Sequence, residues 1–200
     1  GTPQVRPDAQ IDPVSRPTDP HELKYRSLLQ EMASGNEKAL TEFYRSFEAR
    51  IYAFTKIRLN DSHEAADILN DIMWEVWRGA GKYEGRSSVS TWVFGIAHHK
   101  VIDRIRSKSK HVTEPIEDTV TEASNEDLHD LLTQKQLGTH IHYCIEKLSA
   151  DQRQTVHLAF FEDLSYREIG GIVGSPEGTI KARMFHAKQA LKRCLARRIR

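Results

Sequence analysis

The chain has 200 residues, of which 38% are hydrophobic and 28% are charged, so it can bury a sizeable core and is not disordered throughout. No window approaches 18 consecutive apolar residues and the N-terminus lacks an apolar signal core, which disfavours membrane insertion and secretion, and we expect a cytoplasmic protein. The two cysteines, Cys144 and Cys194, are too few for a disulfide framework, so we expect thiols.

The formal net charge of +1 hides a segregation of charge along the chain. Residues 98–110 hold 5 basic and 1 acidic residue, residues 111–130 hold 0 and 7, and residues 177–200 hold 8 and 1. Two basic regions that flank an acidic stretch favour a polyanionic partner. Each basic region, taken alone, also fits a merely solvated helix face.

The composition divides the chain into four parts. Five of the seven prolines lie within the first 20 residues, and we expect residues 1–21 to form a disordered tail. The acidic stretch 111–130 lacks a sustained apolar period and is interpreted as a linker. Residues 22–110 and 131–200 are then two small domains, both predicted to be helical, so the predicted fold class is all-α.

The first domain contains two clear amphipathic patterns. Apolar residues recur every three or four positions from Ala39 to Phe54, and again from Ala65 to Val76 after the cap signal Asp61-Ser62. The second helix carries another face at i, i+3, i+4 and i+7 that holds acids, an amide and an indole, namely Asp67, Asn70, Asp71 and Trp74. An indole outside the core indicates a binding surface.

Glycines at 79, 81 and 85 interrupt the pattern and predict a flexible loop before a helix that begins near Ser90. In that helix Val93, Ala97, Val101 and Ile105 are expected to point inward, while Lys100, Arg104 and Lys108 form a basic strip. Aromatic rings beside cations, here Tyr83 and Trp92, are typical of surfaces that hold single-stranded nucleic acid. Taken alone, however, the segment favours a core Trp92 with solvated cations.

The last 50 residues predict a helix-turn-helix. Ser149 and Ser165 each begin a capping box, Gly174 suits a helix end, and Ser175 with Pro176 is expected to start the next helix. Gly170 lies where the helices 166–173 and 176 onward must approach closely. In the second helix of this motif, the residues expected to point inward are Ile180, Met184, Ala187 and Leu191. The residues on its outer face, which would enter the major groove of DNA, are Thr179, Lys181, Arg183, Phe185, His186 and Lys188. A helical hairpin that does not bind DNA is the alternative.

Three segments in this order resemble the extracytoplasmic-function (ECF) group of bacterial RNA polymerase sigma factors. They are residues 63–73 (HEAADILNDIM), residues 90–106 (STWVFGIAHHKVIDRIR), and residues 164–170 with 178–183 (LSYREIG and GTIKAR). The chain departs from the family at His98-His99, where Arg-Asn or a similar pair is usual, and at Gly170-Gly171, where Ala-Glu is commoner.

The resemblance implies a function for each predicted surface. Core RNA polymerase would bind Asp67, Asn70, Asp71 and Trp74. The −10 element of promoter DNA would be bound and melted by Tyr83, Arg86, Ser88, Trp92, Lys100 and Arg104. The −35 element would be read by the outward residues of the last helix. We expect promoter DNA, core polymerase and an anti-sigma factor as partners, with stress-responsive transcription initiation as the function and no cofactor, metal or membrane insertion.

Other functions were weighed against these residues. A one-component helix-turn-helix regulator with a helical sensor domain remains the alternative. A DNA invertase or resolvase is disfavoured, because residues 22–110 show no strand alternation and no nucleotide loop, so we do not expect an enzyme. A zinc site at His140, His142 and Cys144 is disfavoured because i and i+2 point to different faces of a helix.

Overall fold

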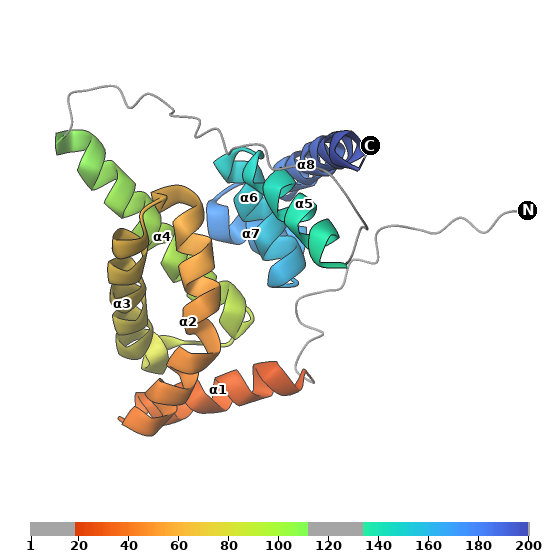
Figure 1. The fold of residues 1–200 in the computed structure, drawn as a ribbon. Coiled ribbons are helices and arrows are strands. Elements are labelled where there is room, and N and C mark those ends of the chain that lie inside the picture. Colours follow the sequence, from red (N-terminus) through yellow and green to blue (C-terminus); the bar gives the residue numbers. More distant parts are fainter. Residues whose placement is uncertain (1–18, 112–133, 200) are drawn as a thin grey trace, which may run out of the picture.

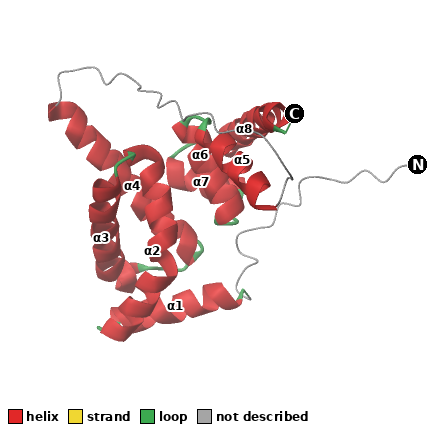
Figure 2. Cartoon of the chain, in the orientation of Figure 1, coloured by secondary structure: helices red, strands yellow, loops and turns green. Residues whose placement is uncertain are grey.

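The computed structural model describes residues 19–111 and 134–199, and these residues form helices and no strand (Figures 1 and 2). The all-α prediction is therefore confirmed. The helices in chain order are α1 (Pro20–Ala33), α2 (Glu37–Leu59), α3 (Ser62–Gly79), the short 3-10 helix η2 (Ala80–Lys82), α4 (Val89–His111), α5 (Gln134–Glu146), α6 (Ala150–Val156), the π-helical turn η3 (His157–Phe161), α7 (Tyr166–Val173) and α8 (Glu177–Arg198).

The predicted tail and linker fall almost entirely outside the described residues. The exceptions are at their edges: α1 begins at Pro20, so residues 20 and 21 are helical rather than part of a tail, and His111 is the last residue of α4. Asp19 caps α1 by accepting a hydrogen bond from the backbone N–H of His21 at 2.9 Å. We refer below to residues 19–111 as the N-terminal half and to residues 134–199 as the C-terminal half.

The core of the N-terminal half is built on the apolar stripe of α2. Phe43, Phe47 and Phe54 are fully buried, and they pack with apolar residues of α3 and α4 in one cluster. Asn36 and Asp61 accept the first backbone N–H groups of α2 and α3, and the cap at Asp61 is the one that the sequence pattern predicts. The inward placement of Ile105 was wrong: this residue is 36% exposed, because the last turns of α4 project beyond the helices that cover its first half (Figure 1).

The helix-turn-helix of the C-terminal half follows the prediction closely. Both capping boxes form, at Ser149 with Gln152 and at Ser165 with Glu168, and Gly174 ends α7 in the left-handed conformation with φ of 70°. The start of α8 was predicted one residue too early. Pro176 rather than Ser175 is the N-cap, since the Pro176 carbonyl accepts the first helical bond, from the Ile180 N–H at 3.2 Å. The Ser175 N–H bonds the Gly170 carbonyl at 3.0 Å within the turn.

A disulfide joins Cys144 of α5 to Cys194 of α8. The expectation of two thiols was therefore wrong. The helices α5 and α8 pack side by side and bring the two Cα atoms to 5.8 Å, a separation that suits a disulfide. The partners are 50 residues apart in the chain, so no local spacing could have indicated the pair.

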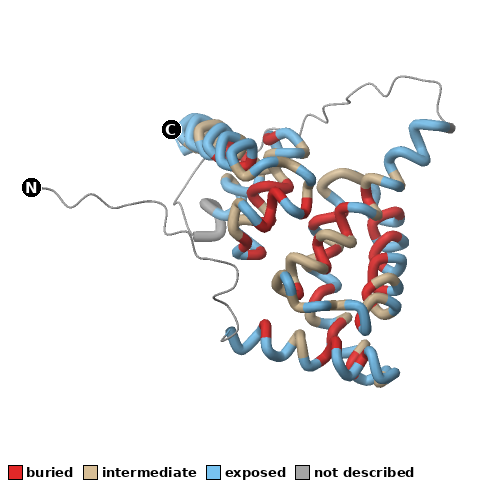
Figure 3. Tube along the Cα trace, turned by 180° about the vertical axis from the view of Figure 1, so that it is seen from behind, coloured by how far each residue is buried: buried red, intermediate tan, exposed pale blue. Residues whose placement is uncertain are grey.

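The two halves pack against each other through a continuous apolar core, in which α4 contacts α7 and α2 contacts α6. Figure 3 shows buried stretches of the chain in both halves. Leu158, Leu164 and Ile169 of the C-terminal half belong to the same buried cluster as the phenylalanines of α2. Polar bonds cross the same boundary. They are Arg50 to Glu162 at 2.5 Å, Arg58 to Asp151, Arg58 to Gln154 at 2.7 Å and Thr91 to Glu168 at 3.1 Å.

The two adjacent glycines of α7 should respond to alanine in opposite ways. A Cβ atom on Gly170 would lie 2.5 Å from the Ser175 carbonyl oxygen, whereas a Cβ on Gly171 meets nothing within 4 Å. Gly170→Ala should therefore destabilise the protein by about 1–3 kcal/mol. Gly171→Ala should stabilise it by about 1 kcal/mol, because alanine is the better helix former. Urea unfolding of both variants checks this, and shifts of the same sign would contradict the tight turn.

His98 is a buried histidine at the boundary between the halves, and its Nδ1 atom has no hydrogen-bond partner among the described residues. Burial first, and then the positive charge of Arg58 and the neighbouring His99, lower its pKa from 6.5 to about 4, while Asp151 acts in the opposite direction. The folded protein thus keeps this imidazole neutral at a pH at which the unfolded chain binds a proton.

We therefore expect His98 to make stability depend on pH in a defined window. Its effect is absent above about pH 6.5, and stability is lost progressively as the pH falls from 6.5 toward 4, since only the unfolded state takes up the proton. Urea midpoints measured across this range should fall less steeply in His98→Gln than in the natural sequence. His186→Gln, which changes an exposed imidazole on α8 that takes no part in lowering the pKa of His98, is the control and should leave the slope unchanged.

Candidate nucleic-acid interface

The second face of α3 is exposed along its whole length. Asp67, Asn70 and Asp71 are all exposed, and the Trp74 side chain next to them is 59% exposed. The opposite face of the same helix is buried in the core of the N-terminal half. The periodicity of the sequence therefore predicts the orientation of this face correctly, and the indole lies on a polar, accessible strip.

The basic strip of α4 lies against the carboxylates of α3. Four ion pairs connect the two helices: Lys100 to Glu75 at 3.3 Å, Arg104 to Asp71 at 3.4 Å and to Glu64 at 3.7 Å, and Lys108 to Glu64 at 2.6 Å. One interpretation of the sequence treated this strip as free to bind nucleic acid, and the other treated its cations as solvated. The structure differs from both, because the cations are paired with carboxylates. Because Asp71 pairs with Arg104, the exposed face of α3 and the basic strip of α4 share an edge.

Tyr83, in the loop that precedes α4, packs against Trp92 in the first turn of α4. Their ring centroids are 5.3 Å apart, both side chains are half-buried, and both pack against the core. The Tyr83 hydroxyl donates a hydrogen bond to the Ser87 carbonyl at 2.5 Å. Burial, together with the nearby Glu22 carboxylate, raises the pKa of Tyr83 to about 12, so its hydroxyl stays protonated. Arg86, by contrast, is exposed and pairs with Glu84 at 2.6 Å.

A pocket of about 280 Å³ opens beside Trp92, between the end of α3, η2 and the first turns of α4. Its lining residues are Glu75, Arg78, Gly79, Lys82, Trp92 and Ile96. The pocket therefore combines an indole and an aliphatic side chain with two cations and one carboxylate, Glu75, which pairs with Arg78 at 3.6 Å. Sequence reasoning singled out Trp92 and missed Arg78 and Lys82, which lie on elements that it treated as a helix end and a loop.

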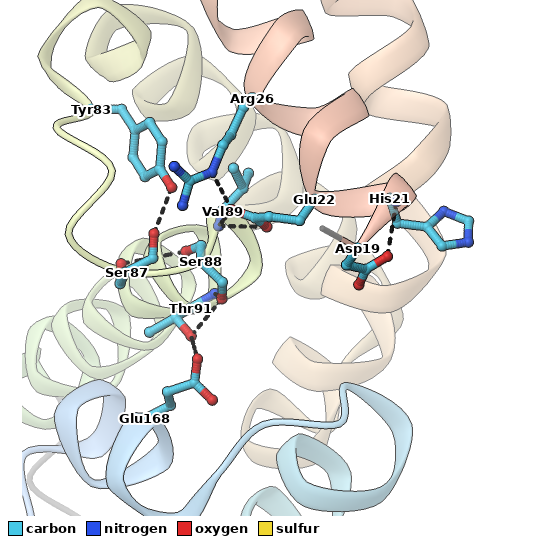
Figure 4. Close-up of polar contacts among 10 residues, drawn as sticks. All are labelled: Asp19, His21, Glu22, Arg26, Tyr83, Ser87, Ser88, Val89, Thr91 and Glu168. Atoms are coloured by element: carbon cyan, nitrogen blue, oxygen red, sulfur yellow. Dashed lines mark hydrogen bonds and ion pairs between the residues drawn. The ribbon is translucent and has the colours of Figure 1, made fainter. Parts of the chain in front are cut away.

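The start of α4 is held by residues from two distant parts of the chain (Figure 4). Ser88 caps the helix by accepting from the Thr91 N–H at 3.1 Å, and its hydroxyl donates to the Thr91 hydroxyl at 2.9 Å. Both carboxylate oxygens of Glu22 accept from the Val89 N–H, each at 3.1 Å. On the other side, Glu168 of α7 accepts from the Thr91 hydroxyl. Of these groups, only Ser88 was among the predicted site residues.

The outer face of α8 carries the residues predicted to read duplex DNA. Five of them are exposed and Arg183 is half-exposed; the exposed ones are Thr179, Lys181, Phe185, His186 and Lys188. Phe185 is 57% exposed, so an aromatic ring lies among cations on this face as well. The structure therefore presents all six residues on the surface, on the helix that follows the turn of the helix-turn-helix.

The histidine and cysteine cluster at the start of the C-terminal half is engaged in other bonds. His140 accepts a hydrogen bond from Arg198 at 3.0 Å, and Cys144 is held in the disulfide. Among residues 19–111 and 134–199, no group of three or more metal-ligating side chains comes together. Within the same ranges, no helix has the length and apolar character needed for a membrane span.

Comparisons with known proteins match both halves of the chain. The Sigma-70 region 2 family model matches residues 43–111, and the Sigma-70 region 4 family model matches residues 140–191. The ECF RNA polymerase sigma factor SigK of Mycobacterium tuberculosis is 26% identical over 84% of this chain and 92% of its own length. SigM of the same species is 27% identical over 88% of this chain and 86% of its own.

Solved structures share the fold. CnrH in complex with the cytosolic domain of CnrY aligns with a TM-score of 0.59 at 16% identity, covering 86% of this chain and 97% of that one. RpoE of Bartonella quintana in complex with the anti-sigma factor NepR aligns with a TM-score of 0.55 at 23% identity, covering 78% and 97%. The two family models together span more than half of the chain in the order of the sequence resemblance, and the protein belongs to the ECF group of RNA polymerase sigma factors.

Proposed function

We propose that this sigma factor docks on core RNA polymerase through α3, captures the melted −10 element with the pocket beside Trp92 and the start of α4, and reads the −35 element with α8. The observation that carries the proposal is that these three surfaces are exposed on the helices, and in the order, that the family requires. The alternative of a one-component regulator is not retained, because the region 2 match covers the half that would have to be its sensor domain.

The polymerase-binding role of α3 rests on the exposure of Trp74 among polar residues. Exposing a large aromatic side chain to water is unfavourable, and 59% of the Trp74 side chain is exposed. Burial of this side chain against a partner protein would be favourable. Aromatic residues of this kind supply much of the binding energy of protein interfaces, while the charged residues around them set orientation. Asp67, Asn70 and Asp71 supply that polar surround.

The −10 role rests on the pocket lined by Trp92. A base that leaves the duplex needs a partner to stack on, and the Trp92 indole and Ile96 provide apolar surfaces inside the pocket. Arg78 and Lys82 are placed there to follow the phosphates of the same strand. Arg86, which is exposed, extends this path. Lys100 and Arg104 join it by exchanging their carboxylate partners on α3 for phosphates.

In the arrangement that the structure shows, the protein cannot contact the −10 and −35 elements at the same time. The helices α4 and α8 both pack on α7, so two helix contacts, or about 20 Å, separate them. The −10 and −35 positions lie 25 base pairs apart, which is about 85 Å of B-form DNA. We infer that the two halves separate when the protein binds polymerase and promoter, and that the described structure is a closed state.

We further propose that an anti-sigma factor holds the protein inactive. The relatives CnrH and RpoE were each solved with a partner chain, CnrY and the anti-sigma factor NepR respectively. A partner that covered the α3 face or the outer face of α8 would block polymerase or DNA. Recovery of polymerase subunits alone from unstressed cells would contradict this part of the proposal.

Because core polymerase and the chromosome lie in the cytoplasm, we place the protein there, and as an initiation factor it needs no catalytic site of its own.

The first test is run-off transcription. The purified chain with core polymerase should transcribe from fragments cloned upstream of its own gene. Trp74→Ala should weaken association with core polymerase at least tenfold, because an exposed aromatic at an interface typically contributes about 2 kcal/mol or more. Phe185→Ala is the matched control, since it removes an equally exposed aromatic from α8 and should leave core association unchanged. Unaltered core binding by Trp74→Ala would overturn the docking role.

The second test concerns α8 and uses promoter duplexes. Arg183→Ala should cost about 1–3 kcal/mol of binding free energy and relax specificity at one base pair of the −35 element. Lys188→Ala, which lies farther along the helix, should weaken binding to all sequences alike and lower the slope of log K against log salt by about 1. Titrations of the holoenzyme at several salt concentrations distinguish the two results. Equal behaviour of both variants would contradict the assigned orientation of α8.

A further inference from the structure

Helix α1 precedes both family-model matches, the first of which begins at residue 43. The matches therefore assign no role to this helix. Its first turn nevertheless approaches the loop that precedes α4 (Figure 4). Glu22 projects from this turn and is only 6% exposed. A buried carboxylate is costly unless its charge is matched, so its partners indicate what it does.

Glu22 hydrogen-bonds Val89 and Arg26, and both residues belong to or touch the proposed −10 surface. Its two oxygens accept from the N–H of Val89, the first residue of α4, whose N–H has no acceptor within the helix. A negative charge at this position is also favoured by the helix dipole. Arg26 balances the charge by donating from Nε to Glu22 at 2.8 Å, and Glu22 in turn raises the pKa of Arg26.

Arg26 carries the contact on to the loop itself. Its guanidinium lies 5.9 Å from the centre of the Tyr83 ring. One of its nitrogens, Nη1, would lie 3.2 Å from a Cβ atom on Gly85, whose φ of +71° already favours glycine. The loop of residues 83–88 is therefore held at both ends. Glu22 holds Val89, which follows the loop, and Arg26 and Trp92 contact Tyr83, which begins it.

We propose that Glu22 is a positioning residue for promoter opening, holding residues 83–88 and the first turn of α4 in the shape that captures an unpaired base beside Trp92. Glu22 is too buried to touch DNA, so it acts only through Val89 and Arg26. The inference rests on the proposed −10 role of this surface. A site that captures a base must be fixed to a fraction of an ångström, and side chains behind the contact surface supply that rigidity.

The test uses the holoenzyme and the single non-template strand of a promoter that it transcribes. An abasic nucleotide is placed at each position of the −10 element in turn. For the natural sequence, we expect loss of the captured base to weaken binding about tenfold or more. In Glu22→Gln this penalty should shrink below about threefold, because the variant no longer pairs with Arg26 and anchors Val89 with a neutral oxygen. Arg26→Met, which keeps the length of the side chain, should give the same result.

The controls separate positioning from a general loss of structure. Glu48→Gln makes the same chemical change at an exposed position of α2 and should retain the full penalty. Core association should match that of the natural sequence in every variant. Glu22→Gln and Arg26→Met each weaken or remove a bond of a buried carboxylate and should lower the thermal unfolding midpoint, so the titrations are made well below the lowest midpoint, where every variant is folded. If Glu22→Gln weakened binding to intact and abasic strands by the same factor, or changed neither, the positioning role would be overturned. If the natural sequence showed no penalty at any position, the proposed −10 role itself would fail.

Discussion

Arg50 is the side chain on which the closed arrangement most depends. Its guanidinium bonds Glu162 of the C-terminal half through two nitrogens, at 2.9 and 2.5 Å, and also contacts the Tyr25 hydroxyl of α1 and the Ser90 hydroxyl of α4. It lies 4.3 Å from the centre of the Phe47 ring. Burial alone would raise the pKa of Glu162, but hydrogen bonds from His157 and Arg50 hold it below its ordinary value. The pair is therefore ionic, and removing either side chain while the halves stay packed would leave the other without its ionic partner.

The same kind of bond recurs on every surface that we propose to bind DNA in the N-terminal half. Carboxylates of α3 pair with the basic strip of α4, and Glu168 bonds Thr91 at the start of α4. These carboxylates occupy donors that a phosphate would otherwise take. Of these bonds, the one from Thr91 to Glu168 crosses to the C-terminal half and stabilises the closed state. Promoter binding would exchange one set of anions for another.

The sequence predicted those features that depend on neighbours within a few residues. The capping boxes at Ser149 and Ser165, the close approach at Gly170 and the exposed face that carries Trp74 are all set within one or two helical turns. Features that depend on packing between distant segments were missed. The Cys144 disulfide, the capping of α4 by Glu22 and the ion pairs between α3 and α4 each join residues that only the fold brings together.

The bonds of Glu168 show how the contact between the two halves can be reversible. Its Oε2 atom accepts from the Ser165 N–H at 2.8 Å and completes the cap of α7, while its Oε1 atom accepts from Thr91 at 3.1 Å. Each oxygen thus has one task, and losing the bond across the boundary leaves the cap intact. The helix-turn-helix can come away from its neighbour and return without unwinding, so detachment and reattachment need no refolding of the module that reads the DNA.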